Sequence, residues 1–99
     1  MRESEVENYL KRNIERAGGM CLKFESPGFS GVPDRLCLMP NGNHFFVELK
    51  APGKKVRPLQ AKVIRMIREL QHPVHVADSK EEVDLLIAKW MTGCGANGD

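Results

Sequence analysis

The sequence PNGN at positions 40–43 constrains the fold more than any other feature of the chain, because it is a turn between two strand-like runs. Residues 32–39 and 44–50 are rich in aromatic, β-branched and aliphatic side chains, which are typical of strands. An Asn-Gly pair between two such runs is a strong signal for a β-hairpin. The sequence therefore predicts an antiparallel strand pair in the middle of the chain.

Hydrophobic periodicity and breaker residues predict the elements around this hairpin. Apolar residues recur at helical spacing before Gly18-Gly19, Pro58 and Pro73 bracket a second helix, and Ser79 with a glutamate three residues later indicates the start of a third. The predicted elements are helix 3–17, strands 20–24, 32–39 and 44–50, helix 59–71, strand 74–77 and a helix from residue 79 onward. The order αβββαβα predicts an α/β protein, in the α+β sense of a central mixed β-sheet flanked by helices.

The length of the chain and the pattern of its second helix predict where the core lies. With 99 residues there is room for one hydrophobic core. We expect residues 1–90 to form a single domain and the glycine-rich residues 91–99 to be a flexible C-terminal tail. The apolar stripe expected to face the core from helix 59–71 consists of Leu59, Val63, Met66, Ile67 and Leu70.

Composition excludes several classes of protein. A chain with 41% hydrophobic and 28% charged residues is neither disordered nor of low complexity. No apolar run approaches the roughly 20 residues that span a bilayer, and the N-terminus lacks the apolar core of a signal peptide. Cys21, Cys37 and Cys94 are too few and too widely spaced for a disulfide framework or a zinc ribbon. We therefore expect a soluble cytoplasmic protein with reduced thiols.

The formal net charge of +2 conceals a strong asymmetry along the chain. Residues 49–68 contain seven basic side chains and no acidic one, which leaves 8 basic against 13 acidic residues elsewhere. The basic side chains are Lys50, Lys54, Lys55, Arg57, Lys62, Arg65 and Arg68. A concentrated positive segment on an otherwise acidic protein indicates contact with phosphate groups rather than a solubilising surface.

Three charged residues lie where strands usually carry apolar side chains. Asp34 is near the start of one hairpin strand, and Glu48 and Lys50 share one face at the end of the other. Two carboxylates that face each other across strands are destabilising unless a cation neutralises them. The pattern predicts a site for a hard cation such as Mg²⁺.

The hairpin register decides whether this site can form. A two-residue turn at Asn41-Gly42 would pair Met39 with His44 and place Asp34 on the face opposite Glu48. A three-residue loop or a β-bulge would bring the two carboxylates together. We therefore predict one of these two irregularities.

Extended motifs around these residues resemble a known nuclease superfamily. The sequence GVPDR at 31–35, followed fourteen residues after its aspartate by ELK at 48–50, resembles the PD-(D/E)xK nucleases. The block FVELKAPG at 46–53 and Gln60 are similar to the VRR-NUC family in its short, stand-alone phage or bacterial form. The resemblance covers roughly residues 3–88 and implies a restriction-endonuclease-like core, similar to that of archaeal Holliday-junction resolvases.

The resemblance assigns roles to the hairpin residues. Asp34 and Glu48 would be carboxylate ligands of Mg²⁺ or Mn²⁺, and the backbone carbonyl of Leu49 would be a third ligand. Lys50 would lie beside the attacking water. A divalent ion lowers the pKa of water and neutralises charge that develops on phosphate oxygens, so the implied chemistry suits phosphodiester hydrolysis.

Two helical residues complete the implied site. Glu7 matches an additional acidic ligand of the family, with Glu3 as the alternative one turn earlier. Glu7 could instead cap its own helix by forming a capping box with Ser4. Gln60 matches a family glutamine beside the site, although its position also suits a solvated residue in a first helical turn.

The implied activity is a metal-dependent, structure-selective DNA endonuclease that cuts branched DNA, such as Holliday junctions or flaps, in replication, recombination or repair. We expect a homodimer, no organic cofactor and no membrane association, in a bacterial or phage-infected cytoplasm. A non-catalytic basic DNA-binding module and a nuclease acting on RNA are the alternatives. The residues expected to contact DNA are Lys54, Lys55, Arg57, Lys62, Arg35 and Ser30.

Overall fold

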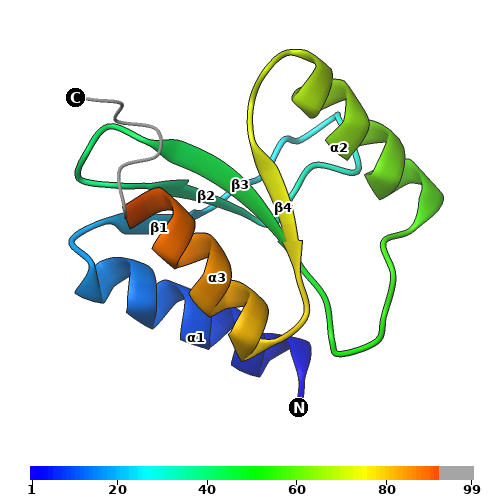
Figure 1. Cartoon of the computed structure of the whole chain (residues 1–99). Helices are drawn as coiled ribbons and strands as arrows, with labels where there is room; N and C mark the ends of the chain where they lie inside the picture. The colour runs from blue at the N-terminus through cyan, green and yellow to red at the C-terminus, as the bar shows by residue number, and fades with distance from the viewer. Residues whose placement is uncertain (92–99) are drawn as a thin grey trace.

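The computed structural model describes residues 1–91 and contains the seven elements in the predicted order (Figure 1). They are α1 (Glu3–Arg16), β1 (Met20–Lys23), β2 (Arg35–Leu38), β3 (His44–Leu49), α2 (Pro58–Glu69), β4 (Val74–Ala77) and α3 (Lys80–Met91). Strand β2 begins at Arg35 rather than at residue 32, because the residues before it form the end of a loop that contains Pro33. The predicted tail at 92–99, including Cys94, lies outside the described residues.

The four strands form one mixed sheet in the order β1-β2-β3-β4. Strands β1, β2 and β3 pair antiparallel, and β4 pairs parallel with β3 after the α2 crossover. Helices α1 and α3 pack side by side on one face, and α2 lies apart from them, joined to the sheet by loops at its two ends (Figure 1). This arrangement confirms the predicted mixed sheet flanked by helices. Within residues 1–91, no helix is long and apolar enough to cross a membrane.

The turn between β2 and β3 has three residues, as the carboxylate pair requires. The Met39 amide donates to the Asn43 carbonyl at 2.8 Å, and the Gly42 amide donates to the Met39 carbonyl at 3.1 Å. Gly42 has a φ of 90°, which glycine adopts without the strain that a β-carbon would cause. Arg35 consequently pairs with Val47, and the next position of the ladder places Asp34 opposite Glu48.

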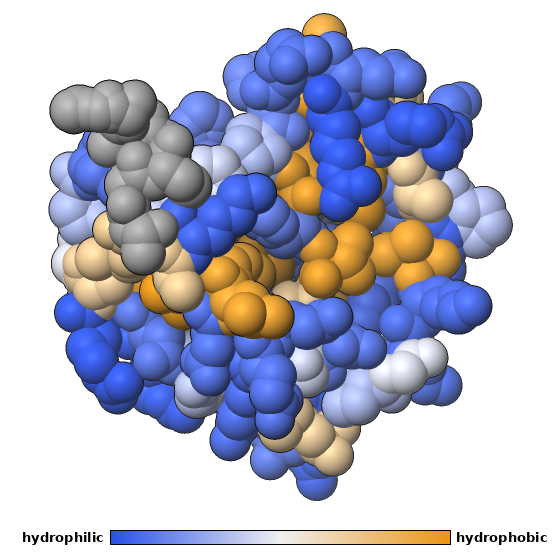
Figure 2. Space-filling model, in the orientation of Figure 1, coloured by the Kyte–Doolittle hydropathy of each residue, from blue (hydrophilic) through white to orange (hydrophobic). Residues whose placement is uncertain are grey.

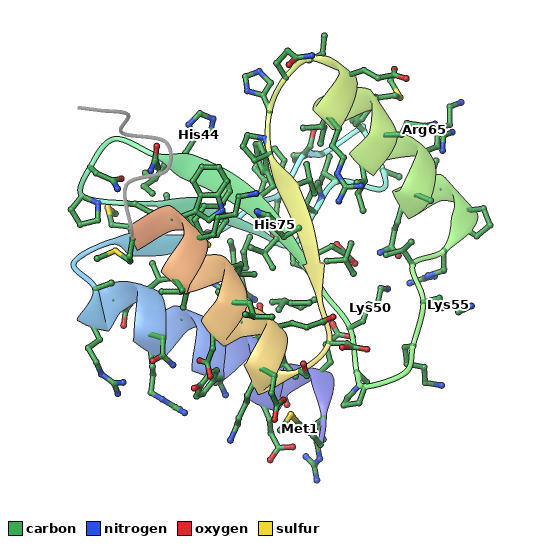
Figure 3. All side chains as sticks on the ribbon, viewed as in Figure 1. Met1, His44, Lys50, Lys55, Arg65 and His75 are labelled. Carbon is green, nitrogen blue, oxygen red and sulfur yellow. The ribbon has the colours of Figure 1, made fainter. Side chains whose placement is uncertain are left out.

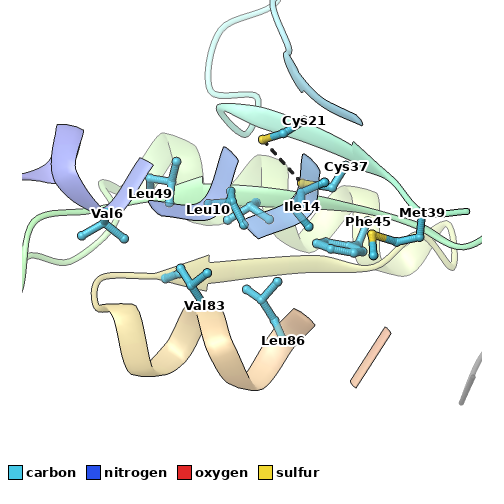
Figure 4. Packing of buried hydrophobic residues seen from close by; sticks show 12 residues of the cluster. Val6, Leu10, Ile14, Cys21, Cys37, Met39, Phe45, Leu49, Val83 and Leu86 are labelled. Carbon is cyan, nitrogen blue, oxygen red and sulfur yellow. Dashed lines mark hydrogen bonds between the residues drawn. The ribbon is translucent and has the colours of Figure 1, made fainter. Parts of the chain in front are cut away.

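One face of the sheet supplies the core of the domain. Phe45, Val47 and Leu49 alternate along β3 and are completely buried on this face. They pack against the apolar stripes of α1 and α3, as seen in Figure 4. The helical members of this cluster are Val6, Leu10, Ile14, Val83 and Leu86. Burial of these side chains is the largest favourable contribution to folding.

A histidine and a pair of cysteines are accommodated beside this core. The His75 Nε2 atom accepts a hydrogen bond from the Trp90 indole at 2.9 Å, and burial lowers the pKa of His75. Cys21 and Cys37 lie opposite each other on β1 and β2 as free buried thiols, with their sulfur atoms 3.9 Å apart. Both cysteines are therefore reduced packing residues, as predicted.

The predicted core stripe of α2 is largely wrong. Only Val63 and Ile64 of this helix are buried, whereas Leu59, Met66 and Leu70 are exposed. The reason is that, among the described helices and strands, α2 packs mainly against β4, so a narrow face of the helix is sufficient to cover its part of the sheet. Figure 2 shows apolar surface in a notch between α2 and α3, beside the edge strand β4.

Candidate active site

Asp34, Glu48 and Lys50 converge at one end of the hairpin. The Asp34 Oδ2 atom accepts a hydrogen bond from the Leu49 backbone amide at 2.9 Å, which fixes this carboxylate against β3. The Lys50 ammonium lies 3.5 Å from Glu48 Oε2. The alternation of β3 places Glu48 on the face opposite the apolar core, because its neighbours Val47 and Leu49 occupy the core side.

Glu48 is the most unusual residue of the site because its carboxylate is buried without full compensation. Its side chain is only 2% exposed, and its Oε1 atom has no hydrogen-bond partner within residues 1–91. Burial, reinforced by the charge of Asp34, raises the pKa of Glu48 from the usual 4.5 to about 7, although Lys50 opposes this shift. A buried carboxylate oxygen without a partner is costly, so its presence in the fold requires an explanation.

The donor set at this position fits a hard divalent ion. Glu48 Oε1 and the Asp34 carboxylate are oxygen donors, and the Leu49 carbonyl points to the Asp34 side of β3 because the Leu49 amide does. Among residues 1–91, no three His, Cys, Asp or Glu side chains group as a metal site. Two carboxylates with one carbonyl and water nevertheless suit Mg²⁺, which keeps several waters when it binds proteins.

Gln60 connects α2 to the site. Its side-chain carbonyl accepts a hydrogen bond from the Arg57 backbone amide at 3.0 Å, and its Nε2 atom donates to Glu48 Oε2 at 2.9 Å. The first bond fixes the orientation of the amide, because only the oxygen can accept from Arg57. Gln60, at the third position of α2, therefore both accepts from the backbone of the N-cap residue Arg57 and donates to the Glu48 carboxylate, and it is not a merely solvated residue.

Glu7 lies near the site but contacts a different partner from the one predicted. Its Oε2 atom accepts a hydrogen bond from Arg35 Nε at 2.8 Å. Neither Ser4 nor Glu7 caps α1, because Ser4 already lies within the helix, the N-cap residue is Arg2, and Glu5 accepts from the Arg2 amide at 2.6 Å. Glu3, the alternative acidic residue, contributes with Asp34 to the raised pKa of Glu48.

Arg35 was expected to contact DNA, and the structure corrects this expectation. The residue is 7% exposed, and its guanidinium donates to Glu7 and, at 3.2 Å, to the Cys21 carbonyl. Alternation along β2 explains the difference, since Arg35 must point to the side opposite Asp34. The partnership joins residues 28 positions apart, so no local pattern in the sequence could have found it.

The other residues expected to contact DNA are exposed. Lys54 and Lys55 lie on the loop that leaves β3 after Lys50, and Arg57 and Lys62 are at the start of α2. Figure 3 shows Lys50 and Lys55 on this side of the molecule. Ser30 is exposed on the loop that precedes Asp34. The segment that carries these exposed basic side chains therefore directly follows Glu48 and Lys50 in the sequence.

The fold and this arrangement of two carboxylates and a lysine define a nuclease-like protein of the PD-(D/E)xK type, and comparisons with known proteins agree. The model of the VRR-NUC domain family matches residues 4–81. "Putative nuclease p44" of Acyrthosiphon pisum secondary endosymbiont phage 1 is 43% identical over 88 residues, covering 89% of this chain and 95% of the relative.

A solved structure described as a VRR_NUC domain shares the fold with a TM-score of 0.82 and 36% sequence identity, covering 87% of this chain and 94% of that one. The chain belongs to the VRR-NUC nuclease family.

Proposed function

We propose that this protein is a Mg²⁺- or Mn²⁺-dependent endonuclease that hydrolyses phosphodiester bonds in branched DNA, including Holliday junctions and flaps. The observation that carries the metal dependence is the buried, unpartnered Oε1 atom of Glu48 beside Asp34. A fold that keeps such an atom has a carboxylate pair prepared for a cation. Membership of a nuclease family indicates the reaction that this cation would serve.

The residues have distinct roles in this proposal. Asp34, Glu48 and the Leu49 carbonyl would hold the ion, which when bound supplies activation of water and stabilisation of charge on the phosphate. Lys50 holds its ammonium 3.5 Å from Glu48, where it can orient the attacking water and interact with a phosphate oxygen. Gln60 holds Glu48 in place by its hydrogen bond of 2.9 Å.

The α1 carboxylates have a secondary role in the proposal. Glu7 would become an additional ligand only by leaving Arg35, and Glu3 would act electrostatically or through water. The exposed Lys54, Lys55 and Arg57, with Lys62 on α2, would contact DNA phosphates next to the cut.

The preference for branched DNA rests on the resemblance to junction resolvases, and the homodimer rests on the small size of the domain. One copy covers little DNA, and two copies related by a twofold axis would present two sites to the arms of a junction. Sedimentation equilibrium at micromolar concentration, with and without junction DNA, tests this part. A protein that is monomeric both with and without junction DNA would contradict the proposed dimer. The proposed location is the cytoplasm of a bacterial or phage-infected cell.

The central experiment compares the wild type with Glu48→Ala and with Glu69→Ala, an exposed glutamate on α2, as the matched control. Each protein is incubated with four-way junction, flap and linear DNA and with RNA, in Mg²⁺, Mn²⁺ or EDTA. We expect cleavage of branched DNA by wild type and control in either metal, none in EDTA, and a loss of more than about 100-fold in Glu48→Ala with DNA binding retained.

The alternatives give different results in the same experiment. Binding of DNA without cleavage in either metal would indicate a non-catalytic DNA-binding module. Cleavage restricted to RNA would indicate a ribonuclease. Cleavage that Glu48→Ala leaves unchanged would contradict the site itself.

A further inference from the structure

Three exposed apolar side chains surround a small hollow next to the proposed metal site. They are Phe29 on the loop before β2, which is 48% exposed, and Leu59 and Met66 on α2, which are 51% and 42% exposed. The hollow has a volume of about 270 Å³. Its other lining residues are Gly28, Ser30, Lys62 and Val63. The part of the predicted α2 stripe that is closer to the N-terminus, Leu59, Val63 and Met66, thus lines this hollow.

The loop that carries Phe29 is held on α2 by a close approach at Gly31. A β-carbon at this position would lie 2.9 Å from a methyl group of Val63 and 3.2 Å from the Leu59 carbonyl oxygen. Gly31 also has a φ of 94°, so glycine permits both the contact and the backbone conformation. The Phe29 amide donates to the Ser26 carbonyl at 3.0 Å. The backbone that carries the ring is therefore held at a defined place beside the helix.

Both of the segments that form the hollow are connected along the chain to the carboxylate site. Gly31 precedes Asp34 by three residues, and Leu59 precedes Gln60, whose amide lies 2.9 Å from Glu48. Lys62 adds a positive charge at the wall of the hollow, and segment 49–68 around it contains no acidic residue. An occupant must therefore combine an apolar, flat surface with nearby negative charge, as a nucleotide does.

We propose that this hollow binds an unpaired nucleobase next to the scissile phosphate, with the base against the Phe29 ring and Lys62 near a flanking phosphate. The proposal rests on the proposed nuclease function and deepens it by naming a residue that selects the substrate. Bases within a continuous duplex are stacked on each other and cannot reach an exposed ring. Unpaired bases at a branch point or in a flap can reach the ring, so Phe29 would favour DNA that contains them.

Binding without cleavage tests the proposal, using fluorescence anisotropy in EDTA with the full-length protein. The probes are a linear duplex, a flap whose unpaired nucleotides carry bases, and the same flap with abasic residues there. We expect Phe29→Leu to weaken binding to the flap by about 5- to 100-fold and to leave the abasic flap and the duplex unchanged. Phe29→Tyr keeps the ring and should bind like wild type. Leu85→Ala, an exposed residue of α3, is the control.

These binding measurements, together with sedimentation and the cleavage experiment of the proposed function applied to Phe29→Leu, contain the results that would overturn the proposal. An equal loss on all three DNAs, or no loss on any of them, would show that Phe29 does not contact a base. A changed sedimentation coefficient in Phe29→Leu would assign the hollow to contact between copies of the chain. Wild-type protein that binds none of the DNAs would overturn the nuclease function too. If Phe29→Leu binds and cleaves branched DNA as well as the wild type does, the proposed base contact is wrong and the nuclease function stands.

Discussion

The two faces of the sheet differ in how completely they are covered, although the same strands build both. On the face toward α1 and α3, Phe45, Val47 and Leu49 are fully buried. On the face toward α2, Phe46 is partly exposed and Leu38 is exposed, while the charged Glu48 is buried. A hollow of about 640 Å³, bounded partly by Phe24 and Phe46, lies on this second face.

The difference indicates that one face of the sheet provides most of the stability and the other face carries the proposed site. We call the face toward α1 and α3 the closed face and the face toward α2 the open face. The closed face buries apolar surface, which is favourable at about 25 cal/mol per Å². The open face keeps a buried carboxylate and exposed apolar side chains, which add little stability or reduce it. The closed face thus offsets the cost of the site on the open face.

The largest expected effect compares one leucine from each region. Leu10→Ala on the closed face removes a fully buried side chain and should lower the free energy of unfolding by about 2–5 kcal/mol. Leu70→Ala, at the end of α2, removes a side chain that is 71% exposed and should change it by less than about 0.5 kcal/mol. Urea denaturation of both variants measures the difference. Equal losses would show that the open face also contributes to the core.

The pH dependence of stability isolates the cost of the buried carboxylate. The folded protein retains a proton on Glu48 up to pH about 7, whereas the unfolded chain releases it near 4.5. The metal-free protein should therefore lose about 3 kcal/mol of stability through this group as the pH rises from 4.5 to 7. The groups that face Glu48 are Asp34, Lys50, Gln60 and Glu3.

Urea titrations in EDTA at pH 5 and pH 8 test this expectation, with Glu48→Gln as the comparison because it cannot ionise. The wild type should lose more stability than Glu48→Gln between the two pH values. Identical losses would show that Glu48 ionises normally.

Two glycines of the same loop test how firmly the open face holds Phe29. Gly31 and Gly28 both have positive φ angles, but only a β-carbon at Gly31 would meet other atoms within 4 Å. Gly28→Ala should cost about 1 kcal/mol from backbone conformation alone. Gly31→Ala should cost about 1–3 kcal/mol more because Val63 must move. Thermal unfolding of both variants provides the measurement, and equal costs would contradict the close packing of loop and helix.

The smallest expected effect concerns the exposed lysines near the site. Replacing Lys54 and Lys55 by alanine should reduce the slope of log Kd against log salt concentration by about 1–2. Lys11→Ala, an exposed lysine of α1 that pairs with Glu15 at 2.7 Å, should leave the slope unchanged. DNA binding measured over a range of salt concentrations tests both. A reduced slope for Lys11→Ala would place DNA on the closed side of the molecule.

Local patterns predicted most of the fold and the centre of the site. Periodicity identified every element, and the requirement that Asp34 face Glu48 correctly predicted an irregular hairpin turn. The prediction that the α2 stripe is buried was wrong, because spacing shows that side chains share one face of a helix but does not show whether another layer covers that face. Pro58 after Arg57, with Gln60 at the third helical position, contained a signal for the cap. The pair formed by Glu7 and Arg35 depends on tertiary packing alone.

The three-residue turn restricts how this hairpin can vary in length during evolution. Loss or gain of one residue between Met39 and Asn43 would exchange the two faces of a strand, turning a carboxylate toward the apolar core. Lineages that keep the site can therefore change the turn only by even numbers of residues, or by one residue together with a compensating bulge. Because no atom of residues 1–91, apart from Gly42 and its chain neighbours, lies within 4 Å of the position that a β-carbon at Gly42 would occupy, this part of the chain leaves room at the tip for an insertion of two residues.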